Sequence, residues 1–275
     1  MLTLNNISKS YPGKKNAVEN VSLSIPRGEI VGLFGENGAG KTTLMKCILG
    51  LHRYQGEITL DDRPLDRRNI EKLSFATSEH TFFPALTPKD HREFYADHFK
   101  SFRGKRFDAL MEFFELPMGK KVGSFSTGQK NQFEVILALC QGADYILMDE
   151  PFAGNDVFNR EDFYKVLLGI LEPEETILLS THLLEEVSAF IGRAILLHKG
   201  KVVADKSMLD LEEEGKDLMS FVKEAYRYKA DRVLQALDKL TEPEPPMGGE
   251  VAWKAGGVRG QRVCCRTDTT EHTLR

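Results

Sequence analysis

The feature that most restricts the fold is a glycine-rich segment, Gly35-Glu36-Asn37-Gly38-Ala39-Gly40-Lys41-Thr42, which lies between an apolar run and a helical pattern. A glycine, four further residues and then Gly-Lys-Thr is the spacing of a phosphate-binding loop. The glycines let successive backbone N–H groups point at phosphate oxygens, and a helix that begins near Gly40 adds the positive end of its dipole. We expect Lys41 to contact the β- and γ-phosphates of a nucleotide and Thr42 to bind Mg²⁺. The alternative is a glycine-rich turn with an idle lysine.

A second signal is the run Tyr145-Ile146-Leu147-Met148-Asp149-Glu150, in which a predicted buried strand ends in two carboxylates. Ligands of α/β sheets bind at the carboxyl ends of the strands. Asp149 therefore suits the Mg²⁺ side of a nucleotide site, and Glu150 suits a base that polarises a water for in-line attack. Many strands end in acidic residues, so this run alone is weak evidence for a nucleotide site. Together with the phosphate-binding loop it becomes specific.

Strand-like and helix-like patterns alternate along the chain, which predicts an α/β protein with a parallel sheet. Strands are predicted where apolar residues alternate or form short runs, and helices where they recur at helical spacing. The predicted strands are residues 2–8, 21–25, 30–34, 57–60, 145–148, 176–180 and 194–197, and the predicted helices are residues 41–51, 131–140 and 162–171.

Aromatic residues gather between residues 82 and 114. Helical spacing predicts that five of them share one broad face: Phe94, Tyr95, His98, Phe99 and Phe102. We interpret this face as core and inter-subdomain packing, with a ligand cage as the alternative.

Composition excludes several classes of protein. The 275 residues carry 37 basic and 41 acidic side chains, which argues against a strongly basic nucleic-acid-binding surface. The longest apolar run, residues 135–140, is far shorter than the roughly 20 residues of a membrane span, and no secretory signal is visible. Cys47, Cys140, Cys264 and Cys265 are interpreted as reduced thiols. We therefore expect a cytoplasmic protein.

The sequence changes character towards its C-terminus. Residues 218–226 place Leu218, Phe221, Val222, Ala225 and Tyr226 on one amphipathic face. Residues 227–249 are predicted to form an accessory helix followed by a Pro/Gly-rich linker. Residues 250–275 show almost no periodicity and are predicted to be a poorly ordered tail.

Over residues 1–226 the sequence resembles the nucleotide-binding subunit of an ABC transporter, with the motifs in the family's order. Residues 35–43, which end in Thr43, match the Walker A motif, and residues 145–150 match Walker B. The resemblance implies a P-loop NTPase core of the RecA type, an antiparallel β subdomain and an α-helical signature subdomain at about residues 80–140. The resemblance also implies that the Walker A residues in contact with the nucleotide are Gly35, Asn37, Gly38, Ala39, Gly40, Lys41, Thr42 and Thr43.

The resemblance also gives roles to residues outside the Walker motifs. Tyr11 would stack on adenine, and His182 would contact the γ-phosphate and take part in catalysis with Glu150. The segment Ser126-Thr127-Gly128-Gln129 matches the signature motif, whose Ser126, Gly128 and Gln129 would reach ATP held by a second subunit, and Asp156 matches the D-loop at that interface. Each has a plainer alternative. For Ser126 and Asp156 it is a helix cap, for His182 it is a structural role, and for Tyr11 it is packing of the ring on the core.

The sequence departs from the family pattern at two places. Thr127 stands where the signature motif usually has a glycine. Ser78 stands where a glutamine usually serves Mg²⁺, with Glu79 beside it, so metal coordination from this loop is left open. Phe82 and Phe83 follow directly, and we expect at least one of these rings at the surface, beside an apolar groove that receives the permease.

The function that the resemblance implies is ATP hydrolysis with Mg²⁺ by a pair of ATPase subunits, identical or different. These subunits would drive export through a separate integral membrane permease, and the permease would hold the chain at the inner face of the cell membrane. The sequence as a whole is similar to those of ATPases of bacterial exporters. One alternative is a soluble ABC-type ATPase in DNA repair or chromosome maintenance, which usually carries long coiled coils or zinc modules. Another is a P-loop kinase or GTPase, which would leave the signature segment and His182 unexplained. No nucleic-acid partner is expected.

Overall fold

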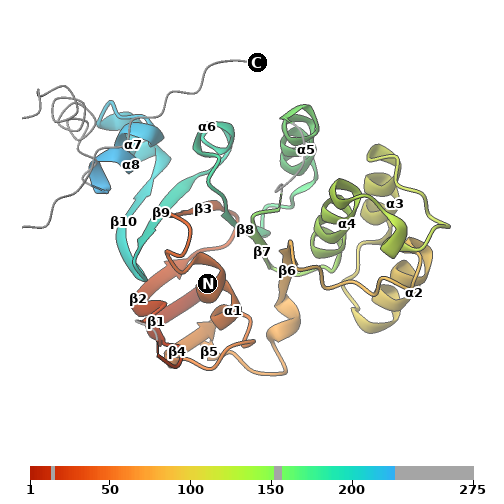
Figure 1. Cartoon of the computed structure of the whole chain (residues 1–275), viewed down its shortest axis with the longest axis horizontal. Helices are drawn as coiled ribbons and strands as arrows, with labels where there is room; N and C mark the ends of the chain where they lie inside the picture. Colours follow the sequence, from red (N-terminus) through yellow and green to blue (C-terminus); the bar gives the residue numbers. More distant parts are fainter. Residues whose placement is uncertain (14–15, 152–156, 227–275) are drawn as a thin grey trace, which may run out of the picture. The chain divides into compact units, whose positions relative to one another are not determined.

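The computed structural model describes the backbone of residues 1–13, 16–151 and 157–226, and the side chains of these residues except 157–163 (Figure 1). All the described residues belong to one compact unit, Met1–Tyr228. The predicted accessory helix and linker at residues 227–249 and the predicted tail at residues 250–275 lie outside the described residues, and so does Asp156.

Four strands form an antiparallel sheet in the order β2-β1-β4-β5. Their bounds are Leu2–Lys9 for β1, Val18–Ile25 for β2, Gln55–Leu60 for β4 and Arg63–Pro64 for β5. Leu2, Leu4 and Ile7 of β1 are buried among more exposed neighbours, as expected for a strand with one face in the core. This sheet confirms the antiparallel subdomain that the family resemblance implied.

Six strands form a second sheet in the order β10-β9-β3-β8-β7-β6. Their bounds are Ile30–Phe34 for β3, Leu73–Thr77 for β6, Tyr145–Asp149 for β7, Thr176–Ser180 for β8, Arg193–His198 for β9 and Lys201–Ser207 for β10. Every pairing is parallel except that of β9 with β10. The strands β7 and β8 are buried along their whole length, because both faces of the sheet are covered. The predicted parallel α/β sheet is confirmed.

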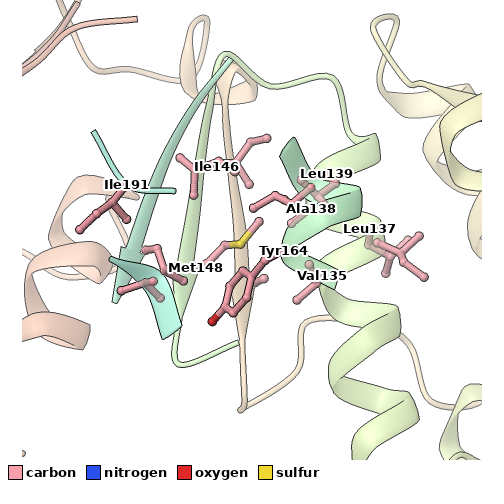
Figure 2. Packing of buried hydrophobic residues seen from close by; sticks show 14 of the residues in the cluster. Val135, Leu137, Ala138, Leu139, Ile146, Met148, Tyr164 and Ile191 are labelled. Carbon is pink, nitrogen blue, oxygen red and sulfur yellow. The ribbon is translucent and has the colours of Figure 1, made fainter. Parts of the chain in front are cut away.

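Two apolar cores lie on the two faces of this sheet, and β7 contributes alternate residues to each. Tyr145 and Leu147 belong to the core that also holds α1 (Lys41–Ile48) and the inner face of the antiparallel sheet. Ile146 and Met148 belong to the other core, with α4 (Thr127–Cys140) and α5 (Val157–Ile170). Figure 2 shows these two side chains between the sheet and the residues that α4 contributes. Helix α1 is thus held between two sheets, which fixes the position of its N-terminus.

The helical region comprises α2 (Pro88–His98), α3 (Gly104–Phe113), the short 3₁₀ helix η2 (Val122–Ser124) and α4. The prediction that one helical face carries all five aromatic residues is wrong. Helix α2 ends at His98 with Phe99 as its C-cap, and Phe102 lies in the turn before α3. The rings still pack together: Phe102 lies 6.0 Å from Tyr95 and 5.9 Å from Phe107 between centroids.

The remaining elements are η1 (Ile70–Lys72), α6 (Leu184–Val187), α7 (Met208–Glu213) and α8 (Leu218–Ala225). Leu218, Phe221 and Val222 of α8 are buried, which confirms the predicted amphipathic face. Cys47 and Cys140 are buried free thiols, and the other two cysteines lie outside the described residues. In the described part of the chain, each helix lacks either the length or the apolar character needed to cross a bilayer.

Candidate nucleotide-binding site

The phosphate-binding loop joins the carboxyl end of β3 to α1, where the sequence predicted it (Figure 1). Gly40 is the N-cap of α1, with a φ of 109° that favours glycine. A Cβ atom on Gly40 would lie 2.2 Å from the carbonyl oxygen of Ala17, and one on Gly35 would lie 2.5 Å from that of Leu197. Only glycine fits at these two positions, because the loop lies directly against the backbone that precedes β2 and against β9.

Lys41, the first residue of α1, turns its ammonium group back over the loop. Its Nζ donates a hydrogen bond of 2.7 Å to the carbonyl oxygen of Gly35 and lies 3.9 Å from Oε1 of Glu150. The side chain is only 7% exposed, so its charge faces the loop and not bulk solvent. A phosphate group held by the N–H groups of the loop would meet this charge at close range.

Asp149, at the carboxyl end of β7, is held by hydroxyl groups on two sides. Thr42 Oγ1 donates to its Oδ2 at 2.6 Å, and Ser180 Oγ donates to its Oδ1 at 2.5 Å. The sequence did not assign a role to Ser180, because its place beside Asp149 depends on the pairing of β8 with β7, which no local pattern records. The strand ends therefore fix the carboxylate against the first turn of α1.

Thr42 and Asp149 suit Mg²⁺ by the chemistry of their donors. Both supply oxygen, the ligand that Mg²⁺ prefers, and both line the same cleft. Among the described residues, no cluster of three or more His, Cys, Asp or Glu side chains is placed to hold a metal ion. In nucleotide sites, phosphate oxygens and water usually complete the shell of Mg²⁺.

Glu150 and His182 lie next to each other at the edge of the site. Glu150 has a φ of 49°, so the chain turns left-handed directly after Asp149, and the two carboxylates contact different side chains. The backbone N–H of Glu150 donates to the carbonyl oxygen of Ser180 at 3.0 Å. Its Oε2 lies 2.9 Å from Nδ1 of His182. When Nδ1 carries the proton in this contact, the other ring nitrogen of His182 is left to face a ligand.

An open cleft of about 330 Å³ brings most of the predicted residues together. Its lining comprises Tyr11, Ala17, Glu36, Asn37, Gly38, Ala39, Gly40, Lys41, Thr42, Thr43, Asp149 and Glu150. Tyr11 stands at its rim with its ring edge-on to His52, 5.8 Å between centroids, and with Lys9 Nζ 5.1 Å from the ring centroid. Tyr11, Lys9 and His52 are half-buried, and stacking of Tyr11 on a base stays a prediction.

The signature segment lies apart from this cleft, at the start of α4. Ser126 is the N-cap: its Oγ accepts from the N–H of Gln129 at 3.2 Å, and the Gln129 side chain accepts from the N–H of Ser126 at 3.0 Å. The structure thus shows the capping role that the sequence left as an alternative. Ser126 and Thr127 are exposed, and none of the lining residues of the cleft comes from this segment.

The loop that follows β6 contains Glu79 and the two phenylalanines, Phe82 and Phe83. Glu79 directs its carboxylate to Lys46 of α1, at 2.7 and 2.8 Å. Phe83 is 49% exposed and lies against His91 and Phe94, whereas Phe82 is buried. The expectation of at least one ring at the surface is confirmed, and the groove for a permease stays a prediction.

Sequence reasoning also missed a buried carboxylate in α4. Glu134 is 1% exposed and accepts hydrogen bonds from the N–H of Thr81, at 3.0 Å to each oxygen, and from its hydroxyl at 2.7 Å. Burial raises the pKa of Glu134, and the bonds from Thr81 oppose that shift. The residue fixes the loop after β6 to the helix that begins at Ser126. Its only sequence signal was a lone acidic residue among apolar ones.

A glycine-rich loop between a central parallel strand and a helix, facing a carboxylate pair at the end of β7, defines a P-loop nucleotide-binding protein. The sequence model of the ABC transporter family matches residues 18–153 of this chain. The chain belongs to the ABC transporter family, as an ATP-binding domain, and it is an ATPase.

Curated relatives support this assignment over most of their length. The ABC transporter ATP-binding protein NatA of Bacillus subtilis (strain 168) is 32% identical over 227 residues, which cover 78% of this chain and 92% of the relative. The lipopolysaccharide export system ATP-binding protein LptB of Escherichia coli (strain K12) is 33% identical over 218 residues, which cover 74% of this chain and 89% of the relative. The family assignment also excludes the alternative of a P-loop kinase or GTPase.

Solved structures share the fold. The structure of an ATP-binding subunit of an ABC transporter has a TM-score of 0.70 at 26% identity, covering 82% of this chain and 98% of that one. A dimeric ATP-binding cassette in a post-hydrolysis state, bound to ADP and Pi, has a TM-score of 0.67 at 26% identity, covering 76% and 99%. These likenesses confirm the P-loop NTPase fold that the sequence predicted.

Proposed function

We propose that this chain is the ATPase subunit of an exporter whose permease is a separate membrane protein. The observation that carries the proposal is the grouping of Lys41, Thr42, Asp149 and Glu150 in one cleft, with His182 in contact with Glu150. Two relatives point to export: LptB serves lipopolysaccharide export, and the SkfA peptide export ATP-binding protein SkfE of Bacillus subtilis is 32% identical over 221 residues.

ATP would bind with its triphosphate along the loop N–H groups and its base on Tyr11. Lys41 neutralises charge on the β- and γ-phosphates, and it leaves its bond to the Gly35 carbonyl to do so. Thr42 and Asp149 would hold Mg²⁺, which supplies charge stabilisation to the departing phosphate oxygens. Because Ser180 already fixes Asp149, the carboxylate stays in place when Thr42 turns to the cation.

Glu150 is the proposed general base. Its carboxylate contacts His182 and not the hydroxyl groups that hold Asp149, so it can accept a proton from the attacking water while Asp149 serves the cation side. His182 orients that carboxylate through Nδ1 and presents its other nitrogen to the γ-phosphate. This division of roles needs two carboxylates that are adjacent in sequence but have different partners.

The second half of each ATP site would come from a partner subunit. Ser126 Oγ accepts one hydrogen bond in its capping box, and its O–H proton remains for an oxygen of ATP held by the partner. The cap and ligand roles of Ser126 are therefore compatible. Gly128 and the N-terminus of α4 add backbone N–H donors. Asp156 is proposed to lie at the same interface. The dimeric ATP-binding cassette among the solved structures supports such a pairing.

The permease would dock beside Phe83, which places an exposed ring next to α2. Burial of an aromatic side chain contributes roughly 1.5–3 kcal/mol to such a contact. Docking would hold the chain at the inner face of the membrane. The DNA-repair alternative predicts no membrane association and no effect of Phe83.

Trapping of the ATP-bound pair tests the catalytic part of the proposal. Glu150→Gln keeps the shape of the side chain and removes the base, so ATP affinity should persist while hydrolysis falls by more than tenfold. With ATP, this variant should elute as a dimer on size-exclusion chromatography, and Ser126→Tyr, placed at the exposed N-cap, should prevent the dimer. Hydrolysis within about tenfold of the wild type, a ΔΔG‡ below roughly 1.4 kcal/mol, would assign the base elsewhere.

A further inference from the structure

Tyr226, which follows the last turn of α8, reaches the base of the phosphate-binding loop. Its hydroxyl lies 3.2 Å from the carbonyl oxygen of Leu197 and 3.5 Å from that of Phe34. Phe34 is the last residue of β3 and directly precedes Gly35, and Leu197 lies on β9, the strand that pairs with β3. The C-cap residue of α8 thus binds the backbone from which the loop starts.

The carbonyl group of Leu197 is also the group against which the loop packs. A Cβ atom on Gly35 would lie 2.5 Å from this oxygen, so the loop backbone and the Tyr226 hydroxyl contact the same atom. The contact leaves no room for this carbonyl to shift towards Gly35 without displacing the loop. The direction of the Leu197 carbonyl therefore sets where the loop begins.

Tyr226 is suited to hold that direction. Burial raises the pKa of Tyr226 to about 12, so its hydroxyl keeps its proton and stays a donor at neutral pH. The ring packs on His198, with 5.5 Å between centroids, and α8 is anchored by its buried Leu218, Phe221 and Val222. The donor is thus fixed by packing on both sides.

The turn between β9 and β10 contacts the loop at a second point. The N–H of Gly200 donates to the carbonyl oxygen of Ala39 at 2.8 Å, and the carbonyl oxygen of Gly200 accepts from the N–H of Glu19 at 2.8 Å. Elements late in the sequence therefore support the middle of the loop as well as its base. None of these contacts involves a residue of the nucleotide-binding motifs through its side chain.

We propose that Tyr226 is a positioning residue for the phosphate-binding loop: it holds the Leu197 and Phe34 carbonyl groups on which the loop is built, and thereby makes ATP affinity depend on the docking of α8. The inference rests on the phosphate-binding role of the loop proposed above. It predicts a loss of affinity without a loss of catalytic groups, because Tyr226 does not touch the reacting atoms.

Tyr226→Phe tests the proposal, because it removes one hydroxyl and keeps the ring. Tyr145→Phe is the matched control: the Tyr145 hydroxyl also donates to a backbone carbonyl at 3.2 Å, that of Ile25, and it lies at the start of β7, away from the loop. For Tyr226→Phe, we expect the ATP Kd, measured by calorimetry, and the KM to rise about threefold to tenfold, the range of one net hydrogen bond. The kcat at saturating ATP should stay within about twofold of the wild type.

Hydrogen exchange of the nucleotide-free protein gives a readout that does not depend on activity. Amides of residues 36–39 should exchange faster in Tyr226→Phe and at the wild-type rate in Tyr145→Phe. An unchanged Kd and unchanged exchange in Tyr226→Phe, or equal changes in both variants, would overturn the proposal. Lys41→Ala distinguishes the phosphate-binding role of the loop from the positioning role of Tyr226. If Lys41→Ala abolishes ATP binding while Tyr226→Phe has no effect, only the positioning role fails. If Lys41→Ala binds ATP normally, the phosphate-binding role fails and the positioning role fails with it.

Discussion

A buried ion pair between α3 and the segment before β8 gives a stability prediction that the structure makes quantitative. Arg106 donates to Glu175 with both nitrogens of its guanidinium fork, at 2.9 and 3.0 Å. It also donates to the carbonyl oxygens of Leu139 in α4, at 3.0 Å, and of Ile170 in α5, at 2.5 Å. The side chains are 10% and 2% exposed, so one arginine joins four elements in a region with little solvent.

Arg106→Met keeps the aliphatic packing and removes every one of these bonds. Glu175 would then be a buried carboxylate without its main partner, and breaking a buried pair in this way costs about 3–5 kcal/mol of folding free energy. Arg103, 3.4 Å from Glu175, and the N–H of Glu172, 2.9 Å away, remain as partners. We therefore expect a loss near the lower end, about 3 kcal/mol, which corresponds to a fall in Tm of roughly 6–12 °C for a domain of this size.

Urea unfolding followed by circular dichroism would measure this loss. Arg92→Met is the control, because Arg92 makes the same two-pronged contact with Asp108, at 2.7 and 2.9 Å, but with side chains 37% and 49% exposed. We expect it to cost less than about 1 kcal/mol. The double variant Arg106→Met with Glu175→Gln should recover part of the loss, because no buried charge is left. Equal effects of the two arginine variants would refute the argument that burial sets the cost.

Further predictions concern the nucleotide site and the permease surface. Lys41→Ala should abolish productive ATP binding by calorimetry, since one charge facing a polyphosphate contributes on the order of several kcal/mol. His182→Ala should lower kcat by more than tenfold, because it removes the γ-phosphate contact and frees the Glu150 carboxylate; an unchanged kcat would argue against the role of this pair. Ser78→Ala should leave the basal ATPase activity of the isolated subunit within about twofold, and a large loss would give Ser78 a part in metal binding. Phe83→Asp should leave that activity intact but reduce co-purification with a membrane permease, and full retention would place the docking surface elsewhere.

Local signals were sufficient for the parts of the chain that carry their own periodicity or their own turn chemistry. Strands β3 and β8 match their predicted bounds, because their apolar runs end at glycine and serine and are covered on both faces. Strands β6 and β10 were missed for a physical reason. In β6 the apolar run is interrupted by the buried Ser74, and β10 is an edge strand in which side chains such as Val203 remain exposed. Pairing with a neighbouring strand, and not side-chain pattern, decides the conformation of such segments.

The residues of the candidate site likewise divide into those that local sequence patterns predicted and those that only the tertiary structure brought together. The sequence by itself determined the phosphate-binding loop, the carboxylate pair and the cap at Ser126, because each depends on a few residues in fixed spacing that form one turn or one helix end. Only the tertiary structure decided that Ser180 holds Asp149, that His182 faces Glu150 and that Tyr226 supports the loop. The first two contacts join residues 31 and 32 positions apart and arise from the order of β7 and β8 in the sheet, whereas the third depends on the packing of α8. Strand order places side chains distant in sequence at one edge, because the parallel strands all end there, and no local spacing records which strands are neighbours.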